Sequence, residues 1–345
     1  MRTNRTEKFK ETNVRRVNIN AGVVRGVAAL ALAAVLATPV QAQDDARSYP
    51  NKPVRIVIGL AAGGGIDVIT RVVAQKLSES IGQPVLVENK PGASGIIAAE
   101  FVAKAPADGY TLMMAPSGPM VFNAVMYPKL PYSPVKDFAP VAMVASFPLI
   151  AVVSAATPIK TMRELVDYAR ANPAKANYAA STAAFQLTTE LFNIQAGIRM
   201  ENITYKGTNE SLTAVMAGDV LTTIADSGPA SGAIRGGKVR ALAVTSAKRM
   251  TAFPDVPTMA EAGFRELDVQ LWAGLFAPAG TPVAIVRKLE DELGRALRTA
   301  EVQQRFATLT VNGGGATGAE LGPLIAAEIA RWSDVAKKAN IKLNN

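Results

Sequence analysis

The chain of 345 residues contains no cysteine and no histidine. Without cysteine it has no disulfide, no thiol nucleophile, no iron–sulfur ligation and no lipid-modified cysteine at a processed N-terminus. Without histidine it lacks a Ser-His-Asp relay, a His-ligated zinc site and the usual general base near neutral pH. Many classes of enzyme are thereby excluded, and the sequence predicts neither a metal site nor a cofactor.

The first 42 residues have the three parts of an export signal. A basic stretch with seven Lys and Arg residues comes first, an apolar run over residues 27–37 follows, and "TPVQAQ" then supplies small residues at Val40 and Ala42. The apolar run is shorter than the roughly 20 residues that a membrane-spanning helix needs. We therefore predict a signal peptide over residues 1–42, cleavage after Ala42, and a mature protein that is soluble in the periplasm.

Removal of this leader changes the charge of the chain. Because the leader carries seven basic and two acidic residues, the formal net charge of +9 falls to +4. The remainder has no basic stripe with interleaved aromatic residues, so we expect no nucleic-acid partner. About 300 residues remain, and this length predicts two domains at about 150 residues each.

Strand and helix patterns alternate along the mature chain, with glycine or proline between them. A β-rich run over residues 54–60 precedes apolar residues at helical spacing, which are Ile66, Ile69, Val73 and Leu77. The same order recurs with a strand over residues 85–87 and a helix over residues 94–104, and again further along. It predicts an α/β fold with mainly parallel sheets flanked by helices, in which ligands bind beyond the carboxyl ends of the strands.

No low-complexity or charged linker separates the two expected domains, so we expect strand-like crossovers to join them. The apolar runs over residues 141–153 and 266–276 are the crossovers that we predict. We assign residues 43–146 and 270–345 to a first lobe and residues 147–269 to a second lobe.

Three expected helices begin with capping signals. Thr161 with Glu164, and Thr317 with Glu320, have the spacing of a capping box. The Thr-Pro dipeptide at residues 281–282 has the order of an N-cap followed by proline at the first helical position. We expect a helix to begin at each of these signals.

Gly63, Gly64 and Gly65 lie between the strand pattern that begins at Val54 and the helix pattern that follows. Glycine lets backbone N–H groups approach a ligand closely, and a helix N-terminus attracts negative charge, so this loop can bind an anion. A tight strand-to-helix turn explains the glycines equally well. Asp67 can cap the helix or receive a cation of the ligand, and we favour the cap.

The spacings that nucleotide-binding loops require are absent. The glycine loop lacks G-x-G-x-x-G and has Ile66 and Asp67 where a Walker A loop needs Lys-Ser/Thr. The stretch "GAIRGGKV", residues 232–239, matches most of Walker A but ends in valine and lies between a helix pattern and a strand pattern, the reverse of the required order. We interpret Gly236 and Gly237 as a helix stop.

The second half of the chain repeats the order of strand, loop and helix at Ser181 and Thr182. Their hydroxyl and N–H groups can receive ligand oxygens or cap a helix. Lys206 and Asp226 end two other strands of the same half. Trp272 lies in the second crossover, where it can line a cleft or belong to the core.

Six stretches of the mature chain, taken in order, resemble one protein family. They are "YPNKPVRIVIGLAAGGGIDVITR", "GQPVLVENKPGASGIIAAEFVAKAPADGYTLMMA", "YPKLPYSPVKDFAPVAMVA", "ITYKGTNESLTAVMAGDV", "GKVRALAVTSAKRMTAFPDVPTMAEAGF" and "LWAGLFAPAGTP". The family is that of the periplasmic solute receptors of tripartite tricarboxylate transporters, of the Bordetella-uptake-gene type. The resemblance extends over essentially the whole mature chain.

This resemblance implies a type II-like periplasmic binding protein, whose two α/β lobes are joined by two crossing strands and close on a small organic acid. In the family, the first glycine-rich loop and the matching loop of the other lobe grip a carboxylate through backbone N–H groups, hydroxyls and bridging waters. The ligand-binding positions implied here are Leu60, Ala61, Gly63, Gly64, Gly65 and Asp67 in the first loop, Ser181, Thr182 and Phe185 in the second loop, and Ser117, Lys206 and Asp226 at strand ends.

Both loops depart from the family's pattern. The first loop commonly reads Pro-Phe-Ala-Pro-Gly-Gly, whereas residues 59–64 here read Gly-Leu-Ala-Ala-Gly-Gly. The second loop lacks the two glycines that are usual there. The fold tolerates these changes, whereas the identity of the ligand stays open.

We predict a monomeric, non-enzymatic receptor that binds a small organic acid and delivers it to the membrane subunits of a transporter. A ligand-sensing partner of a signalling receptor is an alternative that the sequence does not separate from transport. A secreted hydrolase that uses Asp67 and Asp226 as an acid–base pair is the remaining alternative.

Overall fold

The computed structural model describes residues 48–341, and Tyr49 opens a compact unit. The predicted signal peptide, residues 1–42, and its cleavage site after Ala42 lie outside the described residues. Within residues 48–341, no helix is both long and apolar enough to cross a membrane.

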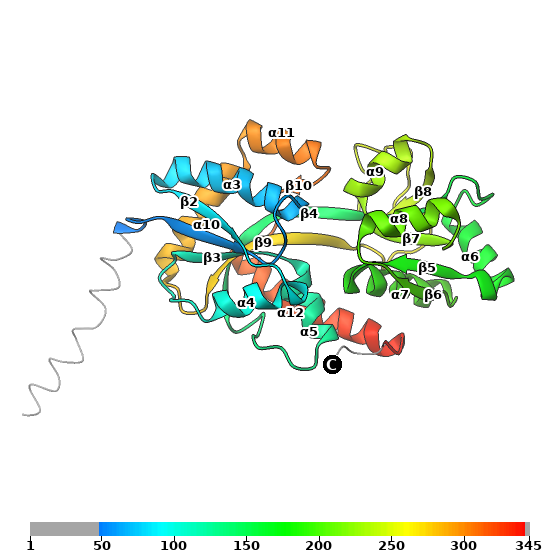
Figure 1. Ribbon diagram of the computed structural model, residues 1–345, viewed down its shortest axis with the longest axis horizontal. Helices are drawn as coiled ribbons and strands as arrows, with labels where there is room; N and C mark the ends of the chain where they lie inside the picture. Colours follow the sequence, from blue (N-terminus) through cyan, green and yellow to red (C-terminus); the bar gives the residue numbers. More distant parts are fainter. Residues whose placement is uncertain (1–47, 342–345) are drawn as a thin grey trace, which may run out of the picture. The chain divides into compact units, whose positions relative to one another are not determined.

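Strands and helices alternate in the first part of this unit, as the sequence predicts. A strand leads through a loop to a helix, and the helix returns the chain to a strand that is parallel to the first, so that three parallel strands are formed (Figure 1). These elements are β1 (Val54–Ile58), α3 (Gly65–Ile81), β2 (Val85–Asn89), η1 (Ala93–Gly95), α4 (Ile96–Ala103), β3 (Thr111–Pro116), η2 (Gly118–Phe122) and α5 (Asn123–Met126). We call the half of the unit built on β1, β2 and β3 the first lobe.

The same order recurs in the middle of the chain, where β5 pairs in parallel with both β6 and β7. The elements there are α6 (Met162–Ala171), η3 (Pro173–Lys175), β5 (Asn177–Ala180), α7 (Ala183–Ala196), β6 (Glu201–Thr204), α8 (Thr208–Ala217), β7 (Thr222–Asp226), α9 (Ser227–Arg235) and β8 (Val239–Val244). We call this half the second lobe. The α/β class is confirmed in both lobes.

Two long strands, β4 (Phe138–Ser154) and β9 (Gln270–Pro278), join the lobes (Figure 1). β4 is antiparallel to β9 up to Pro148, and from Leu149 onward it is antiparallel to β7 and β8. One continuous strand is therefore hydrogen-bonded into both sheets, in the order β2-β1-β3-β9-β4-β7-β5-β6. The two predicted crossing strands are confirmed, although β9 begins a few residues later than expected.

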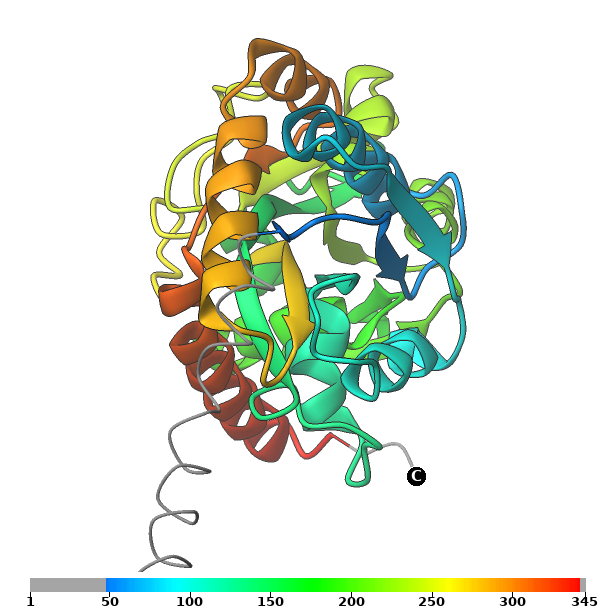
Figure 2. The same cartoon turned by 90° about the vertical axis from the view of Figure 1, so that its left-hand side faces the viewer.

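Helices cover both faces of the sheet of the first lobe. α10 (Val283–Leu297) and α11 (Ala300–Thr308) lie on the same face as α3, whereas α4 and α12 (Gly318–Lys338) lie on the other (Figures 1 and 2). The two-residue strand β10 (Asn312–Gly313) pairs with β4 after α11. In the second lobe, α8 and α9 lie on one face and α7 on the other.

One hydrophobic core cluster is continuous between the lobes. It includes residues of α4 and α12 in the first lobe and of α6 and α7 in the second, and α12 packs against α7. Trp272 of β9 belongs to this cluster at 2% exposure, and its indole N–H donates to Glu328 Oε2 of α12 at 3.0 Å. Burial raises the pKa of the Glu328 carboxyl above its ordinary value. The core alternative for Trp272 is therefore the correct one.

The capping signals are confirmed in part. Thr317 and Glu320 form the predicted capping box of α12. The Thr161 hydroxyl accepts the Glu164 N–H at 3.1 Å, but the Glu164 carboxylate accepts from the N–H of the preceding residue 160, so the box is incomplete. The expected N-cap in the dipeptide at residues 281–282 is wrong, because the threonine hydroxyl donates to a preceding carbonyl and the proline itself is the N-cap of α10.

Thr245, which follows β8 and is fully buried, forms hydrogen bonds at the place where the chain passes from one lobe to the other. Its hydroxyl donates to the carbonyl of Val269 at 2.5 Å and accepts the Leu149 N–H at 2.9 Å. Its backbone N–H and carbonyl bond the same two residues at 2.9 and 3.0 Å. The side chain thereby links β4, the end of β8 and the segment that leads into β9.

Replacing Thr245 by valine keeps the volume of the side chain but leaves a buried N–H at Leu149 and a buried carbonyl at Val269 without their hydroxyl partner. An unsatisfied buried group costs about 1–3 kcal/mol. We expect the free energy of unfolding, measured by urea titration with circular dichroism, to fall by about 2 kcal/mol. Thr251→Val at an exposed position is the matched control. Equal midpoints for the two variants would contradict the role of the hydroxyl.

Candidate functional site

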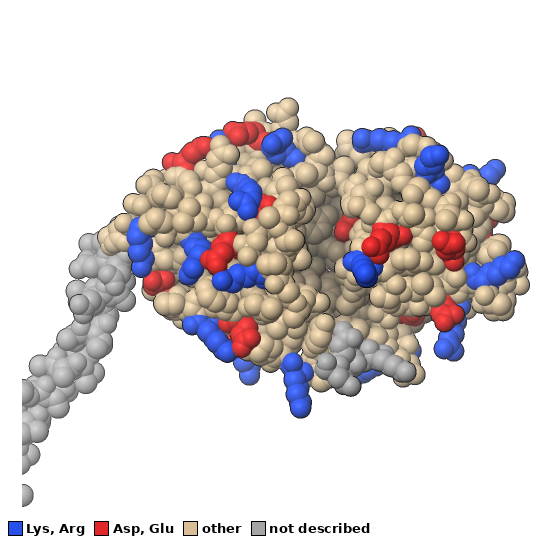
Figure 3. All heavy atoms as spheres, in the orientation of Figure 1, with Lys and Arg blue, Asp and Glu red and all other residues tan. Residues whose placement is uncertain are grey.

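A cavity of about 1250 Å³ lies between the two lobes. The space-filling view shows the surface hollowed at this place (Figure 3). The starts of α3, α7 and α9 contribute to its walls, together with η2, both crossing strands and residues 307–311, which form the end of α11 and the turn after it. The cavity therefore lies beyond the carboxyl ends of β1, β3, β5 and β7, where the strand order of an α/β fold places ligands.

Three helix N-termini face this cavity. Gly65 and Ile66 begin α3 of the first lobe, Ala183 and Ala184 begin α7 of the second lobe, and Ser227 begins α9. The first N–H groups of a helix have no acceptor within the helix, and the helix dipole places partial positive charge at this end. The cavity can thus bind an anion from both lobes through main-chain groups.

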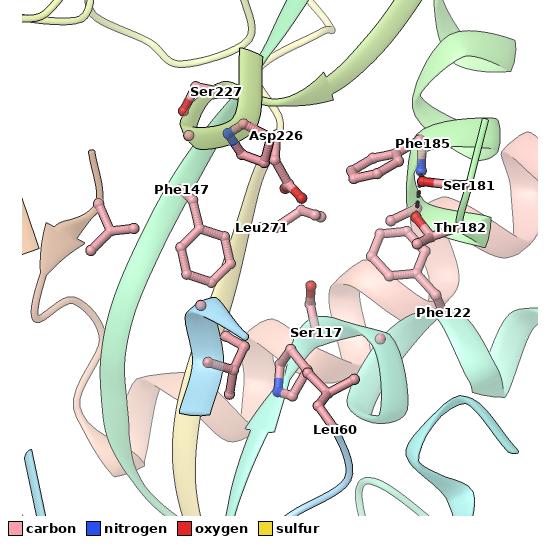
Figure 4. A pocket seen from close by; sticks show the side chains of 18 of the residues that line it. Leu60, Ser117, Phe122, Phe147, Ser181, Thr182, Phe185, Asp226, Ser227 and Leu271 are labelled. Carbon is pink, nitrogen blue, oxygen red and sulfur yellow. Dashed lines mark hydrogen bonds between the residues drawn. The ribbon is translucent and has the colours of Figure 1, made fainter. Parts of the chain in front are cut away.

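Apolar side chains form much of the remaining wall. Phe147 of β4 and Leu271 of β9 are paired directly across the two crossing strands and line the cavity. Because side chains alternate along a strand, the neighbouring Trp272 lies on the opposite face. Phe122 and Phe185, each only 2% exposed, line the cavity from η2 and α7, on the side away from Phe147 (Figure 4).

Few charged groups reach the cavity. Asp226 and Arg235 are the charged side chains among the residues that line it. Arg235 is exposed, and its guanidinium carbon lies 5.9 Å from the centroid of the Phe253 ring. Within residues 48–341, no group of three acidic side chains is placed to hold a metal ion. An anion in this cavity would therefore depend mainly on hydrogen bonds.

Several buried polar atoms at the cavity have no hydrogen-bond partner. They are Ser181 Oγ, Ser227 Oγ and Asn202 Oδ1. Buried polar groups are nearly always hydrogen-bonded in native structures, so these atoms mark places where a ligand or water can complete the bonding. Thr182 differs from its neighbour, because its hydroxyl caps α7 by accepting the Phe185 N–H at 3.3 Å.

Asp67 is buried and engaged within the first loop. Its Oδ2 accepts the Gly63 N–H at 2.9 Å, its oxygens accept from Arg71 Nε at 3.1 and 3.0 Å, and its Oδ1 accepts from Asn89 Nδ2 at 3.0 Å. The bonds from Arg71, which outweigh the opposing effect of burial, lower the pKa of Asp67 to about 2. Gly63 has a φ of +83°, a conformation that favours glycine. Asp67 thus fixes the loop that leads into α3.

Asp226 occupies the N-cap position of α9, but its side chain makes no capping bond. In Figure 4 its carboxylate points into the cavity, and the Ser117 hydroxyl points in from the first lobe. Burial raises the pKa of Asp226 to about 6, and a hydrogen bond from the Thr208 side chain opposes this shift in part. A carboxylate that faces a cavity and lacks a charged partner is a candidate recognition group.

The structure brings together part of the predicted set of ligand-binding residues. Those that line the cavity are Leu60, Gly65, Ser117, Ser181, Thr182, Phe185 and Asp226. Those that are not among the lining residues are Ala61, Gly63, Gly64, Asp67 and Lys206. The side chain of Lys206 is exposed, and its backbone N–H donates to Glu210 at 3.1 Å. Ligand contact by any of the predicted residues stays a prediction.

Other residues of the cavity are missing from the predicted set. They include Phe122, Phe147, Leu271, Arg235 and residues 307–311 at the end of α11 and in the turn after it. The alternation of side chains along a strand could have indicated Leu271. If Trp272 is in the core, the neighbouring Leu271 faces the opposite side of the sheet. Residues 307–311 reach the cavity only through packing of distant parts of the chain, which no local pattern reveals.

Comparison with known proteins identifies relatives that match along most of the chain. A family model described as "Tripartite tricarboxylate transporter family receptor" matches residues 69–341. Protein BugT of Bordetella pertussis is 35% identical over 311 residues, which cover 89% of this chain and 94% of BugT.

Two solved structures of Rhodopseudomonas palustris proteins are similar to this one. Rpa4515, solved with adipate, is 34% identical with a TM-score of 0.75, and the match covers 85% of this chain and 98% of Rpa4515. MatC (Rpa3494), solved with bound malate, is 33% identical with a TM-score of 0.71, and the match covers 83% of this chain and 99% of MatC. Both similarities therefore include the two lobes and the crossing strands.

Replacing Asp67 by asparagine removes the charge that Arg71 binds and weakens the bond to Gly63. We expect the free energy of unfolding at pH 7 to fall by about 1–3 kcal/mol. Because the pKa of Asp67 is lowered from 3.8 to about 2, its contribution is present above pH 3.8 and is lost as the pH falls through about 2. Urea midpoints measured across this range should therefore converge. Glu79→Gln, at an exposed position of the same helix, should change stability little.

Replacing Asp226 by asparagine should stabilise the unliganded protein. The pKa of Asp226 is raised from 3.8 to about 6, so its favourable contribution is present below pH 3.8 and is lost as the pH rises through about 6. We expect the variant to be more stable than the wild type by about 1–2 kcal/mol at pH 8 and to lose this advantage near pH 4. Thermal melts at the two pH values test this, and a variant that is less stable at pH 8 would contradict it.

Proposed function

The chain belongs to the tripartite tricarboxylate transporter receptor family, and from this premise we propose that it binds a small carboxylic acid between its lobes and delivers the acid to the membrane subunits of a transporter. The observation that carries the proposal is the convergence of helix N-termini from both lobes on one cavity. The malate and adipate of the Rhodopseudomonas structures support a carboxylate as the ligand.

Main-chain groups are sufficient for the affinity that such a receptor needs. A hydrogen bond to a charged group contributes about 1.5–3 kcal/mol net. Four or five such bonds sum to about 6–15 kcal/mol, a range that includes the roughly 8 kcal/mol of micromolar binding together with a cost for ordering the ligand. Closure of the lobes would follow if the ligand contacts both, since a difference in binding of about 5.5 kcal/mol converts a mostly open population into a mostly closed one.

The proposal includes the absence of catalysis. A hydrolase would need an acid and a base that act on the same bond. Asp67 is bound by Arg71, Gly63 and Asn89, and it is not among the residues that line the cavity. Asp226 therefore has no acidic partner among the lining residues. This arrangement favours a receptor over the acid–base pair considered from the sequence.

We also propose the lobe boundaries, with residues 43–146 and 270–345 in the first lobe and residues 147–269 in the second. The change of partners along β4 between Pro148 and Leu149 supports the first boundary, and the start of β9 supports the last. We propose further that the protein is monomeric, and that it is released into the periplasm when the leader is cleaved. If the chain instead senses a ligand for a signalling receptor, the ligand would bind in the same cleft.

An aspartate placed at the start of α7 should compete with the ligand for the helix N-terminus. Ala183 is the first residue of α7 and lines the cavity, and an acidic side chain is favourable at this helical position. We expect Ala183→Asp to fold and to lose at least about 10-fold in affinity for any acid that the wild type binds, measured by calorimetry with malate, adipate and a wider panel.

Ala300→Asp makes the same change at the first residue of α11, which does not line the cavity, and should bind like the wild type. Equal binding by both variants would reject the α7 terminus as a carboxylate site. A wild-type protein that binds no acid of the panel would reject the proposed function.

A further inference from the structure

Asp226 is the feature of the cleft that a receptor for simple carboxylates does not explain. An acid held at the helix N-termini would share the cavity with a second carboxylate, and like charges in one site repel each other. The other charged side chain of the lining, Arg235, is exposed and lies over the ring of Phe253. The lining therefore offers no buried cation to offset this repulsion.

The direction of the Asp226 side chain is not imposed by the helix that it begins. An aspartate at the N-cap normally accepts an N–H of the second or third helical residue, which stabilises the helix by about 1 kcal/mol. In α9 the third residue is Pro229, which has no N–H, and Asp226 makes no capping bond. Its carboxylate points into the cavity instead (Figure 4).

The surroundings of Asp226 make an unpaired charge costly. Phe147 and Phe185 contribute apolar surface to the same cavity, and Asp226 itself is partly buried. A shielded carboxylate is stable only if donors or a cation satisfy it. The Thr208 side chain is the protein donor that bonds it.

We propose that Asp226 is the specificity-determining residue of the cleft and that the ligand is a zwitterion, a carboxylic acid that also carries a protonated amine. The carboxylate of the ligand binds at the helix N-termini, and its ammonium group binds Asp226. This inference rests on the proposed function and adds to it the class of acid.

The cavity supplies further acceptors for an ammonium group. An ammonium group has three or fewer N–H donors, and one carboxylate rarely satisfies them all. The Ser117 hydroxyl points into the cavity from the first lobe, opposite Asp226 (Figure 4), and Ser227 Oγ lies next to Asp226 in sequence without a partner. Asp226 on the second lobe and Ser117 on the first would thus contact one group of the ligand, which favours closure.

The alternative ligands satisfy this cavity less well. A dicarboxylate would bring a second negative charge toward Asp226 and would bind only with that side chain protonated. A hydroxy acid would offer a hydrogen bond but would leave the negative charge of Asp226 without a counterion. The ammonium group alone supplies both donors and opposite charge.

Matched ligands test this inference directly. Each series keeps one skeleton and changes one substituent from hydrogen to hydroxyl to ammonium: succinate, malate and aspartate; hexanoate, 2-hydroxyhexanoate and norleucine; 3-phenylpropionate, 3-phenyllactate and phenylalanine. Calorimetric titration of the wild-type protein at pH 7.5 would give the three dissociation constants of each series. We expect the amine-bearing member to bind at least about 10-fold more tightly than its unsubstituted partner in every series that binds.

The variant Asp226→Asn should remove this preference. We expect the affinity for the amine-bearing acid to fall at least about 10-fold and the affinity for the unsubstituted acid to stay level or rise. Asp219→Asn, at an exposed position before β7 that does not line the cavity, is the matched control and should keep the wild-type order. The preference for the amine-bearing acid can also be tested on the wild-type protein alone, by comparing the three acids of each series, so the test does not depend on the folding of a variant.

The outcomes separate the inference from the function on which it rests. If unsubstituted acids or dicarboxylates bind the wild type as tightly as their amine-bearing partners, the zwitterion is rejected and the carboxylate receptor stands. If the preference for the amine survives in Asp226→Asn, the role of Asp226 is rejected. If no member of any series binds, the proposed function is rejected together with this inference.

Discussion

The cleft depends on the hydrogen bonding of a single strand into two sheets. Up to Pro148, β4 is paired with β9, and from Leu149 it is paired with β7 and β8. Any ligand between the lobes therefore lies over a continuous strand. Thr245 bonds Leu149 and Val269, one residue at each crossing, so the pivot is built from buried hydrogen bonds. Such bonds fix the position of β4 relative to the end of β8 at the point where the partners of β4 change.

The polarity of the cleft comes from the main chain more than from charged side chains. A Lys or Arg fixed in the cavity would bind anions of many shapes and would need its own counterion in the unliganded state. Helix N-termini avoid this cost, because their N–H groups already point outward and their dipoles need no partner. Binding by main-chain groups requires that the N–H groups be held in place before the ligand arrives. Asp67 fixes the loop that precedes α3 by accepting a hydrogen bond from the Gly63 N–H.

The sequence predicts the fold better than it predicts the site. Alternating strand and helix patterns, and the apolar runs that became β4 and β9, locate the lobes because each pattern is local. The position of Gly65 and Ser181, each after a strand and before a helix, predicts their place in the cavity lining. No local pattern predicts the place of Phe122 or of residues 307–311 in the cavity, because that place follows from packing between segments far apart in the sequence. Asp67 shows the same limit, since its partner Asn89 lies 22 residues away.

The cleft holds several polar groups in states that folding alone would not favour. Ser181 and Ser227 have buried hydroxyls without partners, and Asp226 leaves its helix uncapped and carries a raised pKa. Each of these features lowers the stability of the fold, and hydrogen bonds to one ligand would satisfy all three groups. The stable contacts, at Thr245 and Asp67, lie outside the cavity and hold its parts in place. The free energy of ligand binding therefore includes a contribution from new hydrogen bonds to polar groups that have no partner within the fold.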